Sequence, residues 1–229
     1  MNESDAKKST KFFGLSRNVI FMGAVSFLND LSSDMIFPFI PIFLTSVLGA
    51  TATFVGMVEG VADATASLLK IISGRLSDKL KVRKPFAVFG YSLSAVAKPL
   101  LAFAAAPWHV LLVRFADRVG KGARDAPRDA LLSFSTEKKY VGRAFGFHRG
   151  ADTLGAAFGP LIAFALLPFL GGESEGGLRN LFLLSFVASF FAILILQFSV
   201  REIKNNHDGI VLPKFEFKFL GVPFIIFLV

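Results

Sequence analysis

Long apolar runs, separated by short charged segments, dominate the pattern of this chain. Because about 20 helical residues cross the hydrocarbon core of a bilayer, each run is long enough for one membrane-spanning helix. Pro38 and Pro41, near the end of the first run, predict a bend there. The runs extend from about Asn18 to Leu48, Ala52 to Ile72, Phe86 to Ala106, Ala144 to Leu170 and Leu178 to Val200.

The stretch from Trp108 to Phe134 is ambiguous, because it is long but rich in charged residues. If Phe86 to Phe115 formed one crossing, that helix would be about 45 Å long, too long for the hydrocarbon core. The basic residues after it would then lie outside, against the positive-inside rule. If Pro107 and Trp108 form an outer turn instead, a fourth, polar helix returns inward. We favour this second alternative, which requires its charges to face partners or water.

Basic residues between the runs predict the topology. Sixteen of the 25 Lys and Arg residues lie in the amino-terminal tail, the Gly74–Pro85 loop, the Ser135–Arg143 loop and the segment after the sixth run. Only Arg179 falls on the opposite side. The positive-inside rule then predicts six spans with a cytoplasmic amino terminus. We therefore divide the chain into a cytoplasmic tail (1–17), a six-span helical unit (18–200), a cytoplasmic linker (201–218) and the start of a seventh span (219–229).

Composition agrees with an all-α, multi-pass membrane protein. The 229 residues are 53% hydrophobic and only 18% charged, with a mean hydropathy of +0.60, whereas a soluble domain carries about 25% charged residues. The lipid bilayer is therefore the first predicted partner. The net charge of +8 does not indicate nucleic acid, because the basic residues cluster between apolar runs as topology signals do. The chain has no cysteine, which excludes a disulfide framework and a thiolate metal site.

Charged residues inside the predicted spans are the candidate functional groups. Counting the helical rise places several of them roughly 15 Å from a membrane face, near the midplane where transporter sites lie. A carboxyl group in a low-dielectric cavity takes up a proton more readily, as a proton-coupled carrier requires. The alternative is that such charges only pair to hold helices together, which fits Arg124, Arg128 and Asp129 best. The proton or substrate candidates are Asp30, Asp34, Glu59, Asp63, Lys98, Arg118 and Asp152.

Motifs for catalysis or cofactor binding are absent from the sequence. His109 and His148 have no further His or Cys at ligand spacing, so we predict no metal site. The segment Gly120–Gly122 is too short for a nucleotide-binding loop. No serine lies in a nucleophile elbow. We expect neither an enzyme nor a bound cofactor.

The segment GRLSDKLKVRKP, Gly74 to Pro85, contains the most specific motif. It resembles the signature Gly-x-Leu-Ala-Asp-Arg-x-Gly-Arg-Arg/Lys between the second and third spans of the major facilitator superfamily. Lys81 stands where that pattern has a turn glycine, and Val82 where it has an arginine. The positions that match in kind are Gly74, Leu76, Asp78, Lys79 and Arg83.

Three further stretches are similar to the same family. Arg118 with Gly122 resembles its fourth-span pattern, in which the arginine is linked to proton transfer. The segment Gly142–Gly146 resembles its inner loop before the fifth span. Gly155-x-x-x-Gly159-Pro160 is similar to the motif of its proton antiporters, although Ala163 and Phe164 replace an expected glycine pair. Close helix packing in lipid explains the two glycines equally well.

The resemblance implies half of a twelve-helix fold, in which six spans form two inverted three-helix repeats. It implies proton-coupled export of a small molecule by alternating access across the plasma (inner) membrane, with the proton gradient as the energy source. Uptake by proton symport and a non-transporting half-length membrane subunit are the alternatives. It also implies a gating loop of Gly74, Asp78, Lys79 and Arg83, where Asp78 would face a helix end of the second six-helix half. Because the last apolar run has only about ten residues, half of a crossing, we expect the chain to be the first half of a longer transporter.

Overall fold

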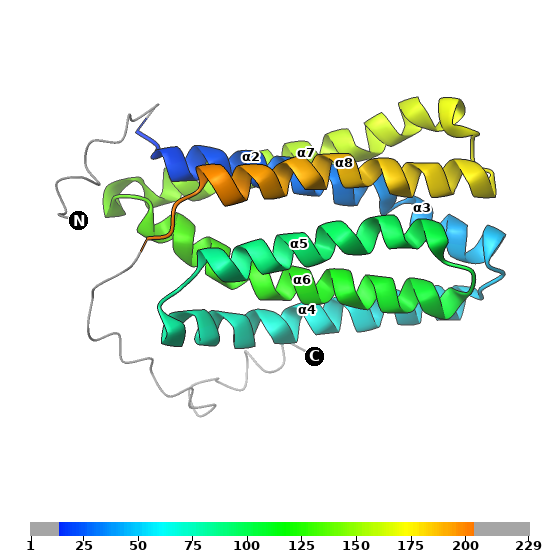
Figure 1. Ribbon diagram of the computed structural model, residues 1–229, viewed down its shortest axis with the longest axis horizontal. Helices are drawn as coiled ribbons and strands as arrows, with labels where there is room; N and C mark the ends of the chain where they lie inside the picture. Colours follow the sequence, from blue (N-terminus) through cyan, green and yellow to red (C-terminus); the bar gives the residue numbers. More distant parts are fainter. Residues whose placement is uncertain (1–13, 204–229) are drawn as a thin grey trace, which may run out of the picture.

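The computed structural model describes residues 14–203, and every regular element within them is a helix (Figure 1). The longer helices are α2 (Arg17–Ile36), α4 (Ala52–Leu80), α5 (Lys84–Leu100), α6 (Pro107–Phe134), α7 (Val141–Leu170) and α8 (Glu175–Ser199). The shorter ones are α3 (Phe39–Ile42), the π-helical η1 (Phe43–Val47), η2 (Leu101–Phe103) and η3 (Lys138–Tyr140).

The long helices lie side by side along the long axis of the molecule, in two groups (Figure 1). One group contains α2, α7 and α8, and the other contains α4, α5 and α6. The groups meet where α5 packs against α8. Four helical segments are long and apolar enough to cross a membrane, namely Arg17–Val47, Lys84–Phe103, Lys138–Leu170 and Glu175–Ser199. Helices α4 and α6, with 29 and 28 residues, are as long but carry more charge.

The first apolar run is interrupted where the sequence predicts a bend. Helix α2 begins after Ser16, whose side-chain oxygen accepts a hydrogen bond from the Val19 amide at 3.4 Å, a common N-cap arrangement. It ends at Ile36, just before Pro38, which cannot donate the hydrogen bond that would continue the helix. The chain resumes as α3 and then the π-helical η1.

The stretch from Pro107 to Phe134 forms one continuous helix, α6, as the second alternative requires. A short connection after η2 reverses the chain, so that α6 returns alongside α5. The two backbones approach closely at a pair of glycines. A Cβ atom on Gly90 would lie 2.4 Å from the Gly120 carbonyl oxygen, a distance that excludes any larger residue without movement.

The prediction that Gly74 to Pro85 forms a loop is wrong. Helix α4 continues to Leu80 and α5 begins at Lys84, which leaves a three-residue turn. Lys81 adopts a left-handed conformation with φ of 54°, and its amide donates to the Asp78 carbonyl at 3.2 Å. Charged side chains at a helix end reach solvent, so the charge in this segment does not stop the helix. The predicted Ser135–Arg143 loop is shortened in the same way by η3 and the early start of α7 at Val141.

Two apolar clusters fill the bundle and leave a polar layer between them. One, near the η1 and η2 ends, includes Phe39, Phe43 and Phe182, and the other, at the opposite end, includes Met22 and Leu131. The residues between the clusters are those at 26–34, 94–98, 114–128 and 185–189, where buried Ser, Asn, Lys and Arg side chains occur. The predicted amino-terminal tail before residue 14, the part of the predicted linker after Ile203 and the predicted seventh span lie outside the described residues.

Candidate functional site

Lys98 lies at the centre of the polar layer, with a relative exposure of 3%. Its Nζ donates to Ser189 Oγ at 2.8 Å, Ser32 Oγ at 3.0 Å and the Asn29 carbonyl at 3.3 Å. Within the described part of the chain no carboxylate lies within 4.0 Å of Nζ. Three neutral oxygens therefore satisfy the three donors of the ammonium and join α5 to α2 and α8.

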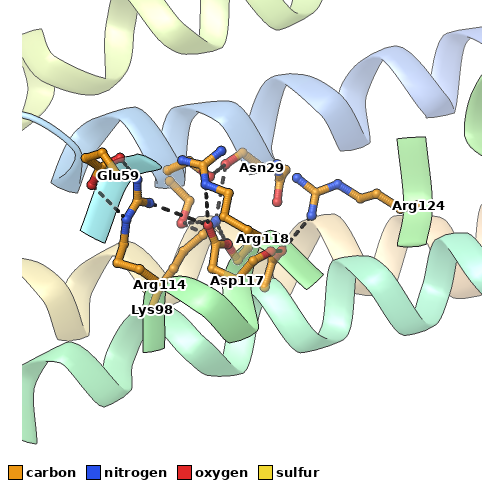
Figure 2. A network of polar contacts seen from close by, with 11 residues as sticks. Asn29, Glu59, Lys98, Arg114, Asp117, Arg118 and Arg124 are labelled. Atoms are coloured by element: carbon orange, nitrogen blue, oxygen red, sulfur yellow. Dashed lines mark hydrogen bonds and ion pairs between the residues drawn. The ribbon is translucent and has the colours of Figure 1, made fainter. Parts of the chain in front are cut away.

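Arg114 on α6 binds Glu59 on α4 through two hydrogen bonds, Nε to Oε1 at 3.2 Å and Nη2 to Oε2 at 2.6 Å (Figure 2). Its Nη1 lies 3.6 Å from Asp117 Oδ2, and the guanidinium stacks over the Phe37 ring at 5.3 Å. Arg114 is thereby paired on two sides, as a buried charge requires.

Asp117 lies between two arginines, because Arg118 Nε is 3.7 Å from the same Oδ2 atom (Figure 2). The Arg118 Nε atom is buried and makes no hydrogen bond with any residue that the structure describes. A small cavity lies beside this group, and both Lys98 and Asp117 line it. Its lining residues are Ser33, Ile36, Lys98, Leu101, Val113, Arg114 and Asp117.

Arg124 and Arg128 behave differently, although the sequence suggests that both form ion pairs. Arg128 does so, with Nη2 2.9 Å from Asp129 Oδ1. For Arg124 the suggestion is wrong. Its Nη1 donates to Ser94 Oγ at 2.6 Å and its guanidinium lies 4.5 Å from the centre of the Tyr91 ring. A hydroxyl and an aromatic face are neutral partners that stabilise a buried guanidinium.

Three candidate carboxylates have no cationic partner within 4.0 Å among the described residues. Asp30, half-buried on α2, accepts a hydrogen bond from the Asn29 side-chain amide at 3.0 Å. Within residues 14–203, neither the half-buried Asp34 nor the exposed Asp63 on α4 makes a hydrogen bond or an ion pair. Glu59 is thus neutralised by Arg114, whereas the carboxylates of Asp30, Asp34 and Asp63 have no ion-pair partner among the described residues. These three are called the available acids.

Asp152 on α7 is paired within its own helix. Its Oδ2 lies 3.5 Å from His148 Nδ1 and 3.3 Å from Arg149 Nη1. The seven candidates thus fall into three groups. Lys98, Arg118 and Glu59 belong to the polar layer around α5 and α6, and Asp152 is paired within α7. The remaining three are the acids without an ion-pair partner, Asp30, Asp34 and Asp63. Sequence reasoning missed the serines that bind Lys98, because isolated serines in apolar helices carry no distinctive signal.

The predicted gating residues surround the turn between α4 and α5. Asp78 Oδ1 lies 3.4 Å from Arg83 Nη2, and the Arg83 guanidinium stacks over the Phe134 ring at 4.3 Å. Gly74 lies within α4, and Lys79 is exposed. Glu202, which the sequence did not single out, accepts hydrogen bonds at Oε2 from the backbone amides of Arg83 at 3.0 Å and Lys84 at 2.6 Å.

The glycines of the fifth-span motif lie against α2. A Cβ on Gly155 would be 2.4 Å from the Phe27 carbonyl oxygen, and one on Gly159 would be 2.8 Å from that of Leu31. Pro160 follows within α7. The two glycines permit close packing of α7 on α2, as small residues do between membrane helices. This packing is the alternative explanation of the motif. As for metals, no group of three or more His, Cys, Asp or Glu residues suited to a metal ion occurs in residues 14–203.

The helical bundle, its apolar segments and its layer of buried charge define an integral membrane protein. The family model described as Major Facilitator Superfamily matches residues 22–227, and the chain belongs to this superfamily. It is therefore a member of a transporter family and not of an enzyme family, as the sequence motifs predict.

Curated relatives agree with this assignment. The chain is 36% identical to the MFS-type transporter MJ1317 of Methanocaldococcus jannaschii, over 82% of this chain and 46% of that protein. It is 30% identical to the multidrug resistance protein MdtH of Photorhabdus laumondii, over 72% of this chain and 39% of that protein. The chain thus spans less than half the length of these relatives.

Solved structures share the fold at low sequence identity. A POT family transporter crystallised with 5-aminolevulinic acid matches with a TM-score of 0.72 and 17% identity, over 84% of this chain and 40% of that one. A bacterial homologue of the lysosomal transporter Spinster, in an inward-facing conformation, matches with a TM-score of 0.69 and 18% identity, over 89% and 46%. At these identities the likeness concerns the fold alone.

Proposed function

We propose that this chain is one half of a secondary active transporter that exports a small molecule in exchange for protons by alternating access. The observation that carries the proposal is the set of carboxylates without a cationic partner, Asp30, Asp34 and Asp63. A carboxylate that no arginine or lysine neutralises can bind a proton or a cationic substrate, and its charge changes when it does. Membership of the superfamily and the name of the relative MdtH support export.

The proposed topology has six membrane spans, arranged as two inverted repeats of three, with the amino terminus in the cytoplasm. The spans are Arg17–Val47, α4, α5 with η2, α6, η3 with α7, and α8. The pairing of Glu59 with Arg114 supports the inclusion of α4 and α6, because it neutralises charges that a lone helix would expose to lipid. The polar layer midway along these helices is at the level expected for a transporter site. We place the protein in the plasma (inner) membrane, with a second six-helix half as its partner.

Protonation couples to transport through the two conformations of the carrier. A proton on Asp63 or Asp34 removes a negative charge from the face of α4 or α2. The state that buries this face is then favoured, since desolvating a neutral carboxyl costs much less than desolvating a carboxylate. Arg118, beside Asp117, supplies a fixed positive charge near this path. No resident cofactor is needed, and the proton gradient drives the cycle.

Asp78 and Arg83 form the proposed gate. Their ion pair spans only 3.4 Å and Asp78 is exposed, so the carboxylate can leave Arg83 without breaking the helix. In the alternative conformation Asp78 binds the amino-terminal end of a helix in the second half, where backbone amides and the helix dipole favour a carboxylate.

The test uses the complete transporter in proteoliposomes, with ethidium as the first probe, followed by panels of drugs, metal ions, sugars and organic anions. An imposed pH gradient should drive probe flux in the wild type and not in Asp63→Asn. Glu173→Gln, which removes an exposed acid from the loop between α7 and α8, should leave the flux unchanged. Undiminished pH-driven flux in Asp63→Asn would remove Asp63 from the mechanism. Flux in the uptake direction would establish symport, and no flux with any probe would establish a non-transporting subunit.

A further inference from the structure

His148 and Asp152 on α7 leave two buried polar atoms without partners. His148 is 1% exposed, and its Nδ1 lies 3.5 Å from Asp152 Oδ2, one helical turn away. The other imidazole nitrogen, Nε2, and the other carboxylate oxygen, Oδ1, are buried and make no hydrogen bond with any described residue. An unsatisfied buried polar atom costs about 1–3 kcal/mol, and native structures rarely keep one without a reason.

Charged groups on neighbouring helices, among them Asp30 on α2, interact electrostatically with the His148–Asp152 pair. The charged groups that face His148 are Arg128 and Asp129 on α6, Asp30 on α2 and Arg149 on α7. Asp152 also interacts electrostatically with Asp30. The charged residues of α8 in the described range, Glu175 and Arg179, lie at its far end. His148 and Asp152 therefore interact electrostatically with Asp30, one of the proposed proton-binding groups, as part of a set of charged groups from three helices.

A purely structural role does not explain the pair. In most buried histidines that only hold helices together, both ring nitrogens make hydrogen bonds, whereas Nε2 of His148 makes none with the described residues. A metal site is also unsuitable, because no third ligand of the required type joins the two residues within 14–203. A group with one nitrogen toward a carboxyl and the other unoccupied has the geometry of a proton shuttle.

We propose that Asp152 and His148 form a gated proton relay on α7, which rests on the proton-coupled transport proposed above. The protonated Asp152 carboxyl loses its proton from Oδ2 as the Nδ1–H bond forms. The Nε2–H bond breaks and its proton passes to a water molecule, which leaves a neutral imidazole and an Asp152 carboxylate. Arg149, with Nη1 3.3 Å from Oδ2, stabilises that carboxylate. Before the next proton passes from Asp30 to Asp152, the imidazole returns to its Nε2–H tautomer by gaining a proton from water at Nε2 and losing the Nδ1 proton to water.

In the present conformation none of the residues 14–203 accepts a hydrogen bond from Nε2, so the relay needs a water molecule to reach this atom. Helix α7 is pressed onto α2 on both sides of the pair, by Gly155 against Phe27 and by the Phe147 ring against Gly23. Water reaches Nε2 when α7 separates from its neighbours during the transport cycle. Coupling of proton flow to substrate transport requires such a gap, because a proton path that stayed continuous in one conformation would let protons cross without substrate.

The functional test compares His148→Gln with the matched control His109→Gln in proteoliposomes that contain an internal pH indicator. His109 lies in the first turn of α6, where its Nδ1 accepts the Ala105 and Ala106 amides, far from the pair. In His148→Gln, ethidium-driven proton flux should fall by about tenfold or more, as expected for loss of an acid–base group, while ethidium exchange without a gradient persists. Wild-type proton flux and an unchanged pH profile in His148→Gln would overturn the relay but leave proton-coupled export intact. Loss of exchange together with proton flux would also overturn it, since His148 would then be a packing residue.

A second measurement does not depend on a transported probe. The chain has three histidines, so the ring nitrogens of His148 can be assigned in a ¹⁵N-histidine NMR spectrum by their disappearance in His148→Gln. The chemical shifts of the His148 ring nitrogens report which nitrogen carries the proton, and at a given pH they should differ between the wild type and Asp152→Asn. His148 signals that are identical in the wild type and in Asp152→Asn at every pH would overturn the relay. Absence of proton flux in the wild type, in contrast, would count against the proposed function itself.

Discussion

Arg114 and Glu59 face each other across the α4–α6 interface through two hydrogen bonds, Nε to Oε1 at 3.2 Å and Nη2 to Oε2 at 2.6 Å. These two helices are as long as the apolar membrane-spanning candidates but carry more charge. The buried Arg114 and the partly buried Glu59 are tolerated because they pair across the interface. The proposed proton coupling therefore rests on the acids that lack a cationic partner within 4.0 Å among the described residues, Asp30, Asp34 and Asp63.

Glu59→Gln should lower the free energy of unfolding in detergent by about 3 kcal/mol, because it leaves a buried arginine without its main charged partner. Asp117, at 3.6 Å from Arg114, limits the loss. Trp108 is the single tryptophan of the chain and lies in the first turn of α6, so its fluorescence reports unfolding of this helix.

Glu175→Gln is the matched control for Glu59→Gln. Glu175 also pairs with an arginine, at 2.9 Å from Arg179, but it is exposed, and such pairs contribute about 0–1 kcal/mol. Equal losses for the two variants would contradict the assignment of the Glu59 pair to a buried interface.

Gly155→Ala should separate α7 from α2 and destabilise the bundle by about 1–3 kcal/mol, as overpacking does. The added Cβ would lie 2.4 Å from the Phe27 carbonyl oxygen. Gly150→Ala on the same helix has nothing within 4 Å and should be neutral or stabilise by up to about 1 kcal/mol through helix propensity. Thermal unfolding of both variants in one detergent provides the comparison, and a similar effect at the two positions would refute close packing at Gly155.

Lys81→Gly should raise the free energy of unfolding by about 0.5–1 kcal/mol. Lys81 has φ of 54°, a conformation that costs other residues about 1–2 kcal/mol and glycine almost nothing, and the gain is partly offset in the unfolded chain. Lys79→Gly, two residues earlier inside α4, should instead destabilise by about 1 kcal/mol. Denaturant titration measures both, and the same sign of change for the two variants would be inconsistent with the observed turn.

Glu202→Ala should lower the free energy of unfolding by about 1–2 kcal/mol, because the amides of Arg83 and Lys84 at the start of α5 lose their acceptor. Glu202→Gln keeps an oxygen acceptor and loses only the charge, so its cost should be smaller, about 0.5–1 kcal/mol. The difference should shrink as salt is raised, since the charge term is screened. Full retention of stability in Glu202→Ala would show that Glu202 does not cap α5.

The helical segments were predictable from sequence to within a few residues, except at the turn after Leu80. There the charged residues Arg75 and Lys79 suggested a loop, although they lie on an extended helix end. The polar α6 was predicted only by combining its length with the positions of basic residues. The Arg124 partner was not predictable, because a serine and a tyrosine replace the expected carboxylate.

By itself the sequence determined the class of protein, the order of its helices and the family. Hydrophobic runs and basic clusters are local patterns, and they decide which segments enter the bilayer and in which orientation without any tertiary contact. Only the tertiary structure decided which charges pair and which remain available. Glu59 and Arg114 are 55 residues apart, and Lys98 finds its serines on two other helices. Such contacts depend on how each helix is rotated and which helix lies beside it, and both are set by packing of the whole bundle.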